Sequence, residues 1–188
     1  MVIQTEETPN PNALKFLLGK SILDNHQTLD FYNAYIAEKS PLASALFELE
    51  GVLRVFVGQD FLVVTKTDAQ SWDFLKSKLL SVIMDFMLTG QPLFSEQENL
   101  SLPEMEIDSE DIEIVKKIKE VLATHVRPSV ASDGGDIVFC GYKNGSVYLK
   151  MMGSCQGCPS SSATLKHGVE RILQHYIPEV LSVEKVTI

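Results

Sequence analysis

The stretch DIVFCGYKNGSVYLKMM at residues 136–152 decides the fold of the second half of this chain. Two strand-like apolar runs flank the pair Asn144-Gly145. A type I′ turn needs positive φ at both central residues, and Asn-Gly adopts it readily. We therefore expect a hairpin with a two-residue loop, in which Cys140 shares the core face with Leu149. The predicted facing pairs are Tyr142 with Val147, Cys140 with Leu149, and Val138 with Met151.

An amphipathic helix is expected on each side of this hairpin, because apolar residues at three- or four-residue spacing lie on one helix face. The first set is Ile114, Ile118, Val121, Leu122 and His125. The second set is Leu165, Val169, Ile172, Leu173 and Tyr176. His125 and Tyr176 are therefore expected to pack in the core. Pro178 ends the second helix before a strand-like run, so the predicted order is α-β-β-α-β.

The first half begins with two strands and a helix. Strands are expected at 2–8 and 13–18, on either side of the turn sequence PNPN at 9–12. The helix that follows has Ser40 as its N-cap and Pro41 at its first position.

A second hairpin and a long helix complete the first half as β-β-α-β-β-α. The β-branched runs at 51–58 and 61–67 meet at Gly58-Gln59-Asp60. The helix is expected to end near Gly90, where a glycine can cap it. Its predicted buried face consists of Trp72, Leu75, Leu79, Ile83 and Phe86.

Residues 90–111 have the composition of a linker, with two prolines, seven acidic residues and no lysine or arginine. We therefore predict an α+β protein of two small two-layer domains, 1–90 and 109–188, joined by an acidic linker at 91–108. Each domain would have a small core, so a partner surface or a bound metal is expected to add stability.

Composition excludes several classes of protein. The net charge is −9, and residues 1–100 and 101–188 are both acidic, at −6 and −3. No basic cluster exceeds KKIK at 116–119, so nucleic-acid binding is not expected. The sequence contains no run of 18 apolar residues, so a membrane-spanning helix is not expected. The acidic, proline-containing start predicts a cytoplasmic protein, or an organellar one, such as a protein of the mitochondrial matrix, that is already processed.

Cys155 and Cys158 form a CxxC pair before the second helix of this half. Pro159 is expected at the first helical position, which places both thiols at a helix N-terminus. Free amide hydrogens and the helix dipole favour thiolates there, as both nucleophiles and metal ligands require. Gly153 and Gly157 allow the chain to turn both sulfurs to one side.

Three chemistries and one bland alternative remain open for this pair. Two small residues at a turn need no function, and a redox disulfide would use the same helix N-terminus, although a hairpin here precedes the motif. A structural zinc site needs four ligands and this chain has no second pair. An iron–sulfur cluster takes four thiolates, which two chains could supply from loops predicted to be exposed. Of the histidines, His167 is expected on the surface and His175 beside a helix end, and neither is a strong ligand candidate.

The sequence SDGGDIVFCGYKNGSVYLKMMGSCQGCPSSSATLKHGVERILQHYIPEV at 132–180 resembles the C-terminal module of NifU, the Nfu domain. Residues 3–23, 40–66 and 72–86 are similar to the Nfu N-terminal domain. The resemblance covers nearly the whole chain outside the predicted linker.

This resemblance implies an iron–sulfur cluster scaffold or carrier rather than an enzyme. It implies a 4Fe-4S cluster bound between two subunits through Cys155 and Cys158, and then handed to apo iron–sulfur proteins. Upstream cluster-assembly proteins are implied as further partners, and a homodimer or higher oligomer when the cluster is bound. Cys140 lies outside the motif and takes no role. The alternative is a dithiol oxidoreductase with thioredoxin-like activity, using the same two cysteines.

Two further groups of polar residues lie near the CxxC motif in the sequence. Asp133 and Asp136 could form an acid/base pair, but the Gly134-Gly135 between them favours a turn of unusual φ. The serines at 160–162 are expected to satisfy free amide hydrogens or to hydrogen-bond the ligand sulfurs.

Overall fold

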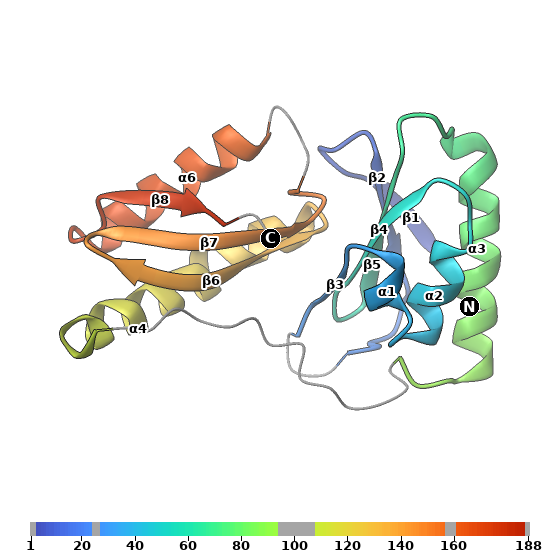
Figure 1. Cartoon of the computed structure of the whole chain (residues 1–188), viewed down its shortest axis with the longest axis horizontal. Helices are drawn as coiled ribbons and strands as arrows, with labels where there is room; N and C mark the ends of the chain where they lie inside the picture. The colour runs from blue at the N-terminus through green and yellow to red at the C-terminus, as the bar shows by residue number, and fades with distance from the viewer. Residues whose placement is uncertain (1–2, 24–26, 94–107, 157–160, 187–188) are drawn as a thin grey trace. The chain divides into compact units, whose positions relative to one another are not determined.

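The computed structural model describes residues 3–23, 27–93, 108–156 and 161–186, with only the backbone described for 161–163. The chain divides into two compact units, 1–100 and 101–188. Most of the predicted linker falls on 94–107, outside the described residues. Both units combine sheets with helices, so the predicted α+β class is confirmed (Figure 1). None of the helices in the described ranges has the length and apolar character needed to cross a membrane.

The first unit is a five-stranded antiparallel sheet with helices packed on it (Figure 1). In chain order its elements are β1 (Gln4–Glu7), β2 (Ala13–Leu17), β3 (Leu29–Phe31), α1 (Ala34–Ala37), α2 (Pro41–Phe47), β4 (Val52–Val57), β5 (Phe61–Lys66) and α3 (Trp72–Thr89). The strand order is β1-β2-β5-β4-β3, which leaves β1 and β3 at the edges. Strand β3 and helix α1 were not predicted, because three and four residues are too few to show a periodic pattern.

Local signals in this unit act as predicted. Ser40 has an extended backbone and its side chain accepts a hydrogen bond from the Ala43 amide at 3.3 Å, with Pro41 at the first helical position. The long helix α3 ends at Gly90, whose φ of +64° is the left-handed conformation of a glycine cap. Ser40 therefore fixes the start of α2 and Gly90 fixes the end of α3.

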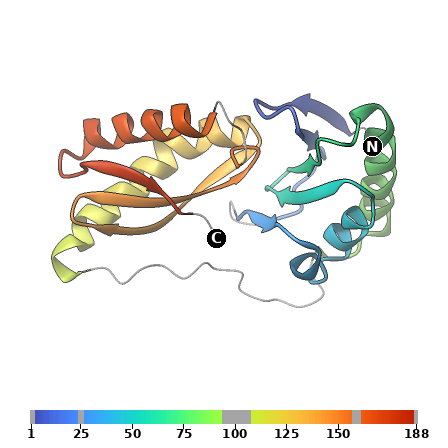
Figure 2. The ribbon, with the colours of Figure 1, turned by 45° about the horizontal axis from the view of Figure 1, so that its top comes forward.

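The second unit is a three-stranded sheet, in the order β6-β7-β8, with α4 and α6 on one face (Figure 2). Its elements are η1 (Ser109–Asp111), α4 (Ile112–Val121), η2 (Leu122–Val126), α5 (Arg127–Ser132), β6 (Gly135–Lys143), β7 (Ser146–Gly153), α6 (Ser161–Tyr176) and β8 (Ser182–Lys185). Strands β6 and β7 are antiparallel, and β8 runs parallel to β7. The predicted α-β-β-α-β order is confirmed.

The first helix of this unit continues beyond the predicted apolar set. It passes through the π-helical turn η2 into α5, which has a proline in its first turn. Pro128 has no amide hydrogen, so it cannot donate the usual helical bond to Thr124, and a widened turn accommodates this loss.

The widened turn explains why the core prediction for His125 is wrong. His125 is exposed and Val126 is buried in its place, because a π turn advances each residue by a smaller angle and shifts the apolar stripe. The prediction for Tyr176 is also wrong. Tyr176 is 50% exposed, and Ile177 takes the core position after the helix ends. The rings of His125 and Tyr176 stack on each other at 4.6 Å between centroids.

The Asn144-Gly145 turn is confirmed, with φ values of +50° and +80°. Tyr142 faces Val147 as predicted, but a β-bulge between Phe139 and Gly141 shifts the remaining register by one residue. The bulge pairs Phe139 with Leu149 and Ile137 with Met151, so the facing pairs predicted for Cys140 and Val138 are wrong.

The bulge also changes the place of Cys140. Phe139 and Leu149 belong to the core cluster of this unit, whereas Cys140 is buried, at 7% exposure, outside that cluster. Its Sγ lies 3.7 Å from the carbonyl oxygen of Val138. The predicted burial is therefore confirmed, whereas the predicted pairing with Leu149 is wrong.

Candidate cysteine site

Cys155 lies in the turn that follows β7. Gly153, the last residue of that strand, has a φ of +66°, which allows the chain to leave the sheet. The amide of Gln156 donates to the carbonyl of Gly153 at 3.1 Å and closes the turn. Cys158 and Pro159 lie outside the described residues, and α6 is described from Ser161 onward. The predicted position of the pair at a helix N-terminus therefore stays a prediction.

Cys155 packs directly against Gly135, the first residue of β6. A Cβ atom built on Gly135 would lie 2.5 Å from the Sγ of Cys155 and 2.8 Å from the carbonyl oxygen of Met152. Only glycine leaves room for the thiol at this point. Cys155 is 6% exposed, so the expectation that both thiols lie on an exposed loop is wrong for Cys155. The close approach of strand β6 covers it.

Ser154 ties the turn that holds Cys155 to the turn that precedes β6. Its hydroxyl donates to the carbonyl oxygen of Asp133 at 2.6 Å, and its amide donates to the carbonyl of Gly134 at 3.1 Å. The same Oγ lies 4.0 Å from the Sγ of Cys155. Gly134 has a φ of +80°, which confirms the predicted turn. The turn that contains Cys155 is therefore hydrogen-bonded through Ser154 to the turn that precedes β6.

Asp136 and Arg127 form a bidentate ion pair beside these turns. Arg127 donates from Nε to Oδ1 at 2.8 Å and from Nη2 to Oδ2 at 2.7 Å. The amide of Ile137 also donates to Oδ1 of Asp136, at 2.8 Å. Hydrogen bonding to Asp136 is the main cause of the raised pKa of the Arg127 guanidinium. Asp136 is 2% exposed and fully engaged, so it acts as a structural anchor for the start of β6.

The sequence analysis missed Arg127. The two partners are nine positions apart, in a helix and a strand, and no short motif links them. A basic residue before a DGGD sequence would have been the only local hint.

The remaining candidate residues do not join this cluster. His167 is exposed, as predicted, and His175 lies in the last turn of α6, beside the helix end, as predicted. Within the described ranges, no group of three or more His, Cys, Asp or Glu side chains is placed to hold a metal ion. The predicted support from serines 160–162 falls outside the described side chains.

An apolar groove runs beside the Asp133 turn, between η2–α5 and α6. It has a volume of about 490 Å³. Its apolar lining residues include Val126, Val130, Leu165, Val169 and Ile172.

Both units match known protein families. Residues 3–90 match the family model for the scaffold protein Nfu/NifU N terminal, and residues 118–184 match the NifU-like domain, which includes Cys155 and Cys158. The chain is 49% identical over 187 residues to NifU-like protein 5, mitochondrial, of Arabidopsis thaliana. It is 51% identical over 186 residues to the NFU1 iron-sulfur cluster scaffold homolog, mitochondrial, of Drosophila willistoni.

These relatives are longer than the chain. The alignments cover 98% and 99% of this chain, but 68% and 64% of the plant and fly proteins. The solution structure of a NifU-like protein from Saccharomyces cerevisiae is 26% identical to this chain, with a TM-score of 0.48. That match covers 52% of this chain and 87% of the yeast one. From the two domain matches and the near-complete alignments, this chain belongs to the Nfu family of NifU-like proteins.

Proposed function

We propose that this protein is an iron–sulfur cluster scaffold and carrier. Cys155 and Cys158 of two copies together hold a 4Fe-4S cluster, which the protein passes to apo iron–sulfur proteins. The relatives named as iron-sulfur cluster scaffold homologs support this role, as does the match of residues 118–184 to the NifU-like domain. The names of the relatives also favour the mitochondrial matrix over the bacterial cytoplasm as the compartment.

The observation that carries the proposal is the close packing of the Cys155 sulfur against Gly135. Two bonded turns hold the thiol, and a glycine clears the space for it. The donor set suits the cargo, because cysteine thiolates are the ordinary ligands of iron–sulfur clusters. The hydroxyl of Ser154, 4.0 Å from the sulfur, adds a polar group next to the ligand.

One chain supplies two CxxC thiolates and a 4Fe-4S cluster takes four, so two copies complete the site. Loading then favours the dimer by mass action, and loss of the cluster favours separation. A site divided between subunits suits a carrier, because separation of the subunits releases half of the ligands at once.

Transfer to a client is a ligand exchange without a redox change. At each iron a client cysteine replaces Cys155 or Cys158, so one Fe–S bond forms as one breaks. The proton from the client thiol passes to the cysteine that leaves. Irons and sulfides keep their number and oxidation state. The partners are apo iron–sulfur clients and the upstream assembly proteins that load the carrier.

Anaerobic reconstitution with iron and sulfide tests this proposal. The expected product contains four irons and four sulfides per two chains and elutes as a dimer, with visible absorption that disappears when the cluster is removed. Mixing it with an apo-ferredoxin should move the iron to the ferredoxin.

Cysteine variants give the matched controls. Cys155→Ser and Cys158→Ser should each abolish the cluster, whereas Cys140→Ser should retain it. A colourless monomer that reduces insulin disulfides through a Cys155–Cys158 disulfide would instead establish the dithiol oxidoreductase. One tightly bound zinc per chain would establish a structural metal site. Either result overturns the carrier.

A further inference from the structure

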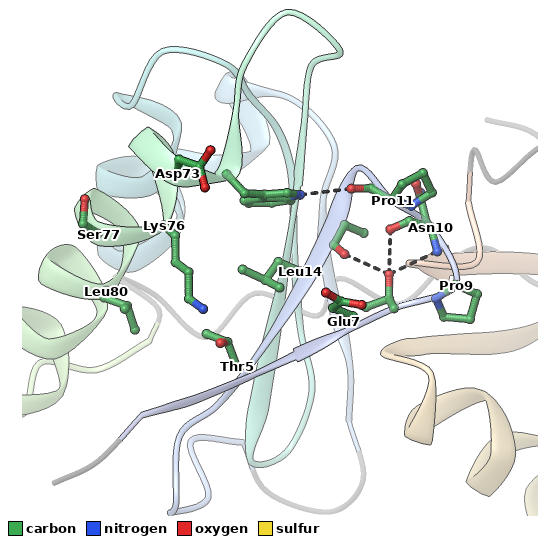
Figure 3. Close-up of a pocket in the computed structure, with 13 residues that line it drawn as sticks. Thr5, Glu7, Pro9, Asn10, Pro11, Leu14, Asp73, Lys76, Ser77 and Leu80 are labelled. Atoms are coloured by element: carbon green, nitrogen blue, oxygen red, sulfur yellow. Dashed lines mark hydrogen bonds between the residues drawn. The ribbon is translucent and has the colours of Figure 1, made fainter.

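The first unit contains a groove between edge strand β1 and helix α3, shown in Figure 3. Its volume is about 810 Å³. Thr5 and Glu7 line it from β1, and Asp73, Lys76 and Leu80 line it from α3. Leu14 of β2 lies between these two walls. The groove therefore combines an apolar base with charged walls.

The turn at Thr8–Asn12 closes one end of the groove and is held rigidly. The Thr8 hydroxyl donates to the carbonyl oxygens of Asn10 and Ala13, both at 2.9 Å. The indole of Trp72 donates to the carbonyl oxygen of Pro11 at 3.0 Å (Figure 3). A preformed wall of this kind lowers the entropy cost of binding a ligand.

The backbone of β1 supplies the means of binding. β1 is the first strand of the sheet and pairs with β2 along one side only, so its other side has no strand partner within the described ranges. A groove between an edge strand and a helix accepts an extended peptide, which adds a strand through main-chain hydrogen bonds and inserts alternate side chains.

Charge selects among the possible occupants. Glu7 and Asp73 are exposed in the groove walls, where Lys76 is the only lysine or arginine among the described residues that line the groove. A second copy of β1 would bring Glu6 and Glu7 against this acidic surface, and like charges opposite each other destabilise a strand pair. Residues 94–107 of the same chain contain four glutamates and no lysine or arginine, so they are disfavoured for the same reason.

We propose that the β1–α3 groove binds an extended segment of a partner protein, in which an apolar residue has a lysine or arginine two positions before it and two positions after it, so that all three side chains share one face. The segment extends the sheet at β1, packs its apolar side chain against Leu80 of α3, and directs its basic side chains toward Glu7 and Asp73. The net charge of −6 on residues 1–100 attracts such a partner over a longer range. This inference involves neither Cys155 nor Cys158.

Trp72 provides the measurement, since it is the only tryptophan of the chain and lines the groove. The full chain carrying Cys155→Ser and Cys158→Ser keeps metal out of the assay. Its Trp72 emission is followed against the peptide acetyl-TKTVTKT-amide, with acetyl-TETVTET-amide and acetyl-TKPVPKT-amide as matched controls. The basic peptide should bind about tenfold more tightly than either control, because the acidic one is repelled and the prolines remove backbone donors.

Two variants locate the site. Glu7→Lys should weaken the basic peptide about tenfold and improve binding of the acidic one, whereas Glu50→Lys, the same change outside the groove, should leave both unchanged. Amide hydrogen exchange at Gln4–Glu7 should slow when the basic peptide binds. Three equal affinities, no binding below about 1 mM, or an equal effect of Glu50→Lys overturns the proposal. A dimer without peptide that Glu7→Lys alters would show that a second copy fills the groove, and it overturns the proposal as well.

Discussion

Gly135 and Cys155 are in such close contact that a Cβ atom on the glycine would lie 2.5 Å from the cysteine sulfur. Gly135 begins β6 and Cys155 follows the end of β7, so both lie at the open end of the hairpin, where Gly135 pairs with Gly153. Their contact brings the proposed ligand onto the sheet. The position of the thiol therefore depends on a residue that has no chemistry of its own.

Gly135→Ala should displace Cys155 and lower both stability and cluster content. Overpacking of this kind costs about 1–3 kcal/mol, because neither the sulfur nor the Met152 carbonyl can move freely. Iron per chain after reconstitution and urea unfolding measure the two effects. Trp72 reports unfolding of the first unit, and far-UV circular dichroism reports both units. The part of the dichroism transition that does not coincide with the Trp72 transition therefore follows the second unit.

Gly168→Ala is the matched control for this substitution. A Cβ at Gly168 would meet no atom within 4 Å, and the residue is inside α6. Alanine should therefore stabilise the helix by about 0.5–1 kcal/mol and leave the iron content unchanged. Equal iron content in Gly135→Ala and Gly168→Ala would contradict the role of the contact between Gly135 and Cys155.

Arg127→Ala should destabilise the second unit by about 2–4 kcal/mol, because it leaves the buried carboxylate of Asp136 without its bidentate partner. The estimate is toward the lower end for a buried pair, since the Arg127 side chain is 36% exposed. Urea unfolding of both single variants and of the double variant with Asp136→Ala tests the coupling. Strictly additive losses would show that the two side chains do not act together.

Cys140→Ser should retain the full iron content and change the free energy of unfolding by about 1 kcal/mol or less. The thiol lies at the bulge, outside the core cluster, and a hydroxyl can keep the contact with the Val138 carbonyl. Iron analysis and urea unfolding measure these effects. Loss of the cluster in this variant would make Cys140 a ligand and contradict the assignment to the CxxC pair.

Tyr142→Phe should reduce the decrease in the free energy of unfolding that occurs as the pH rises above about 10. Burial is the main cause of the raised pKa of Tyr142, and the charges of Asp111 and Glu179 add to it. The folded protein therefore holds the phenol proton more tightly than the unfolded chain. This stabilisation is complete below the ordinary tyrosine pKa of about 10 and is lost as the pH rises through the higher folded value.

Urea unfolding of wild type and Tyr142→Phe at a series of pH values around and above 10 measures this difference. Other alkaline titrations occur in both proteins and cancel in the comparison. Parallel profiles would show that the phenol titrates alike in the folded and unfolded states.

Features that depend on neighbouring residues could be predicted from the amino-acid sequence. The Asn144-Gly145 turn, the Ser40 cap and the Gly90 helix end follow from φ preferences and local hydrogen bonds, and the structure has all three. The order of the main helices and strands follows from apolar periodicity, which also involves residues only a few positions apart. The CxxC pair could also be recognised, because its two cysteines are three positions apart and the Nfu-like residues surround them at 132–180.

Contacts between residues that are distant in the chain could not be predicted and emerge only in the folded structure. The bulge moved Cys140 out of register with Leu149, and a π turn before Pro128 brought His125 to the surface. The seat of Cys155 on Gly135 and the pair of Arg127 with Asp136 each join residues from different elements. These contacts depend on register and close packing across the fold, where a shift of one residue changes which side chains touch.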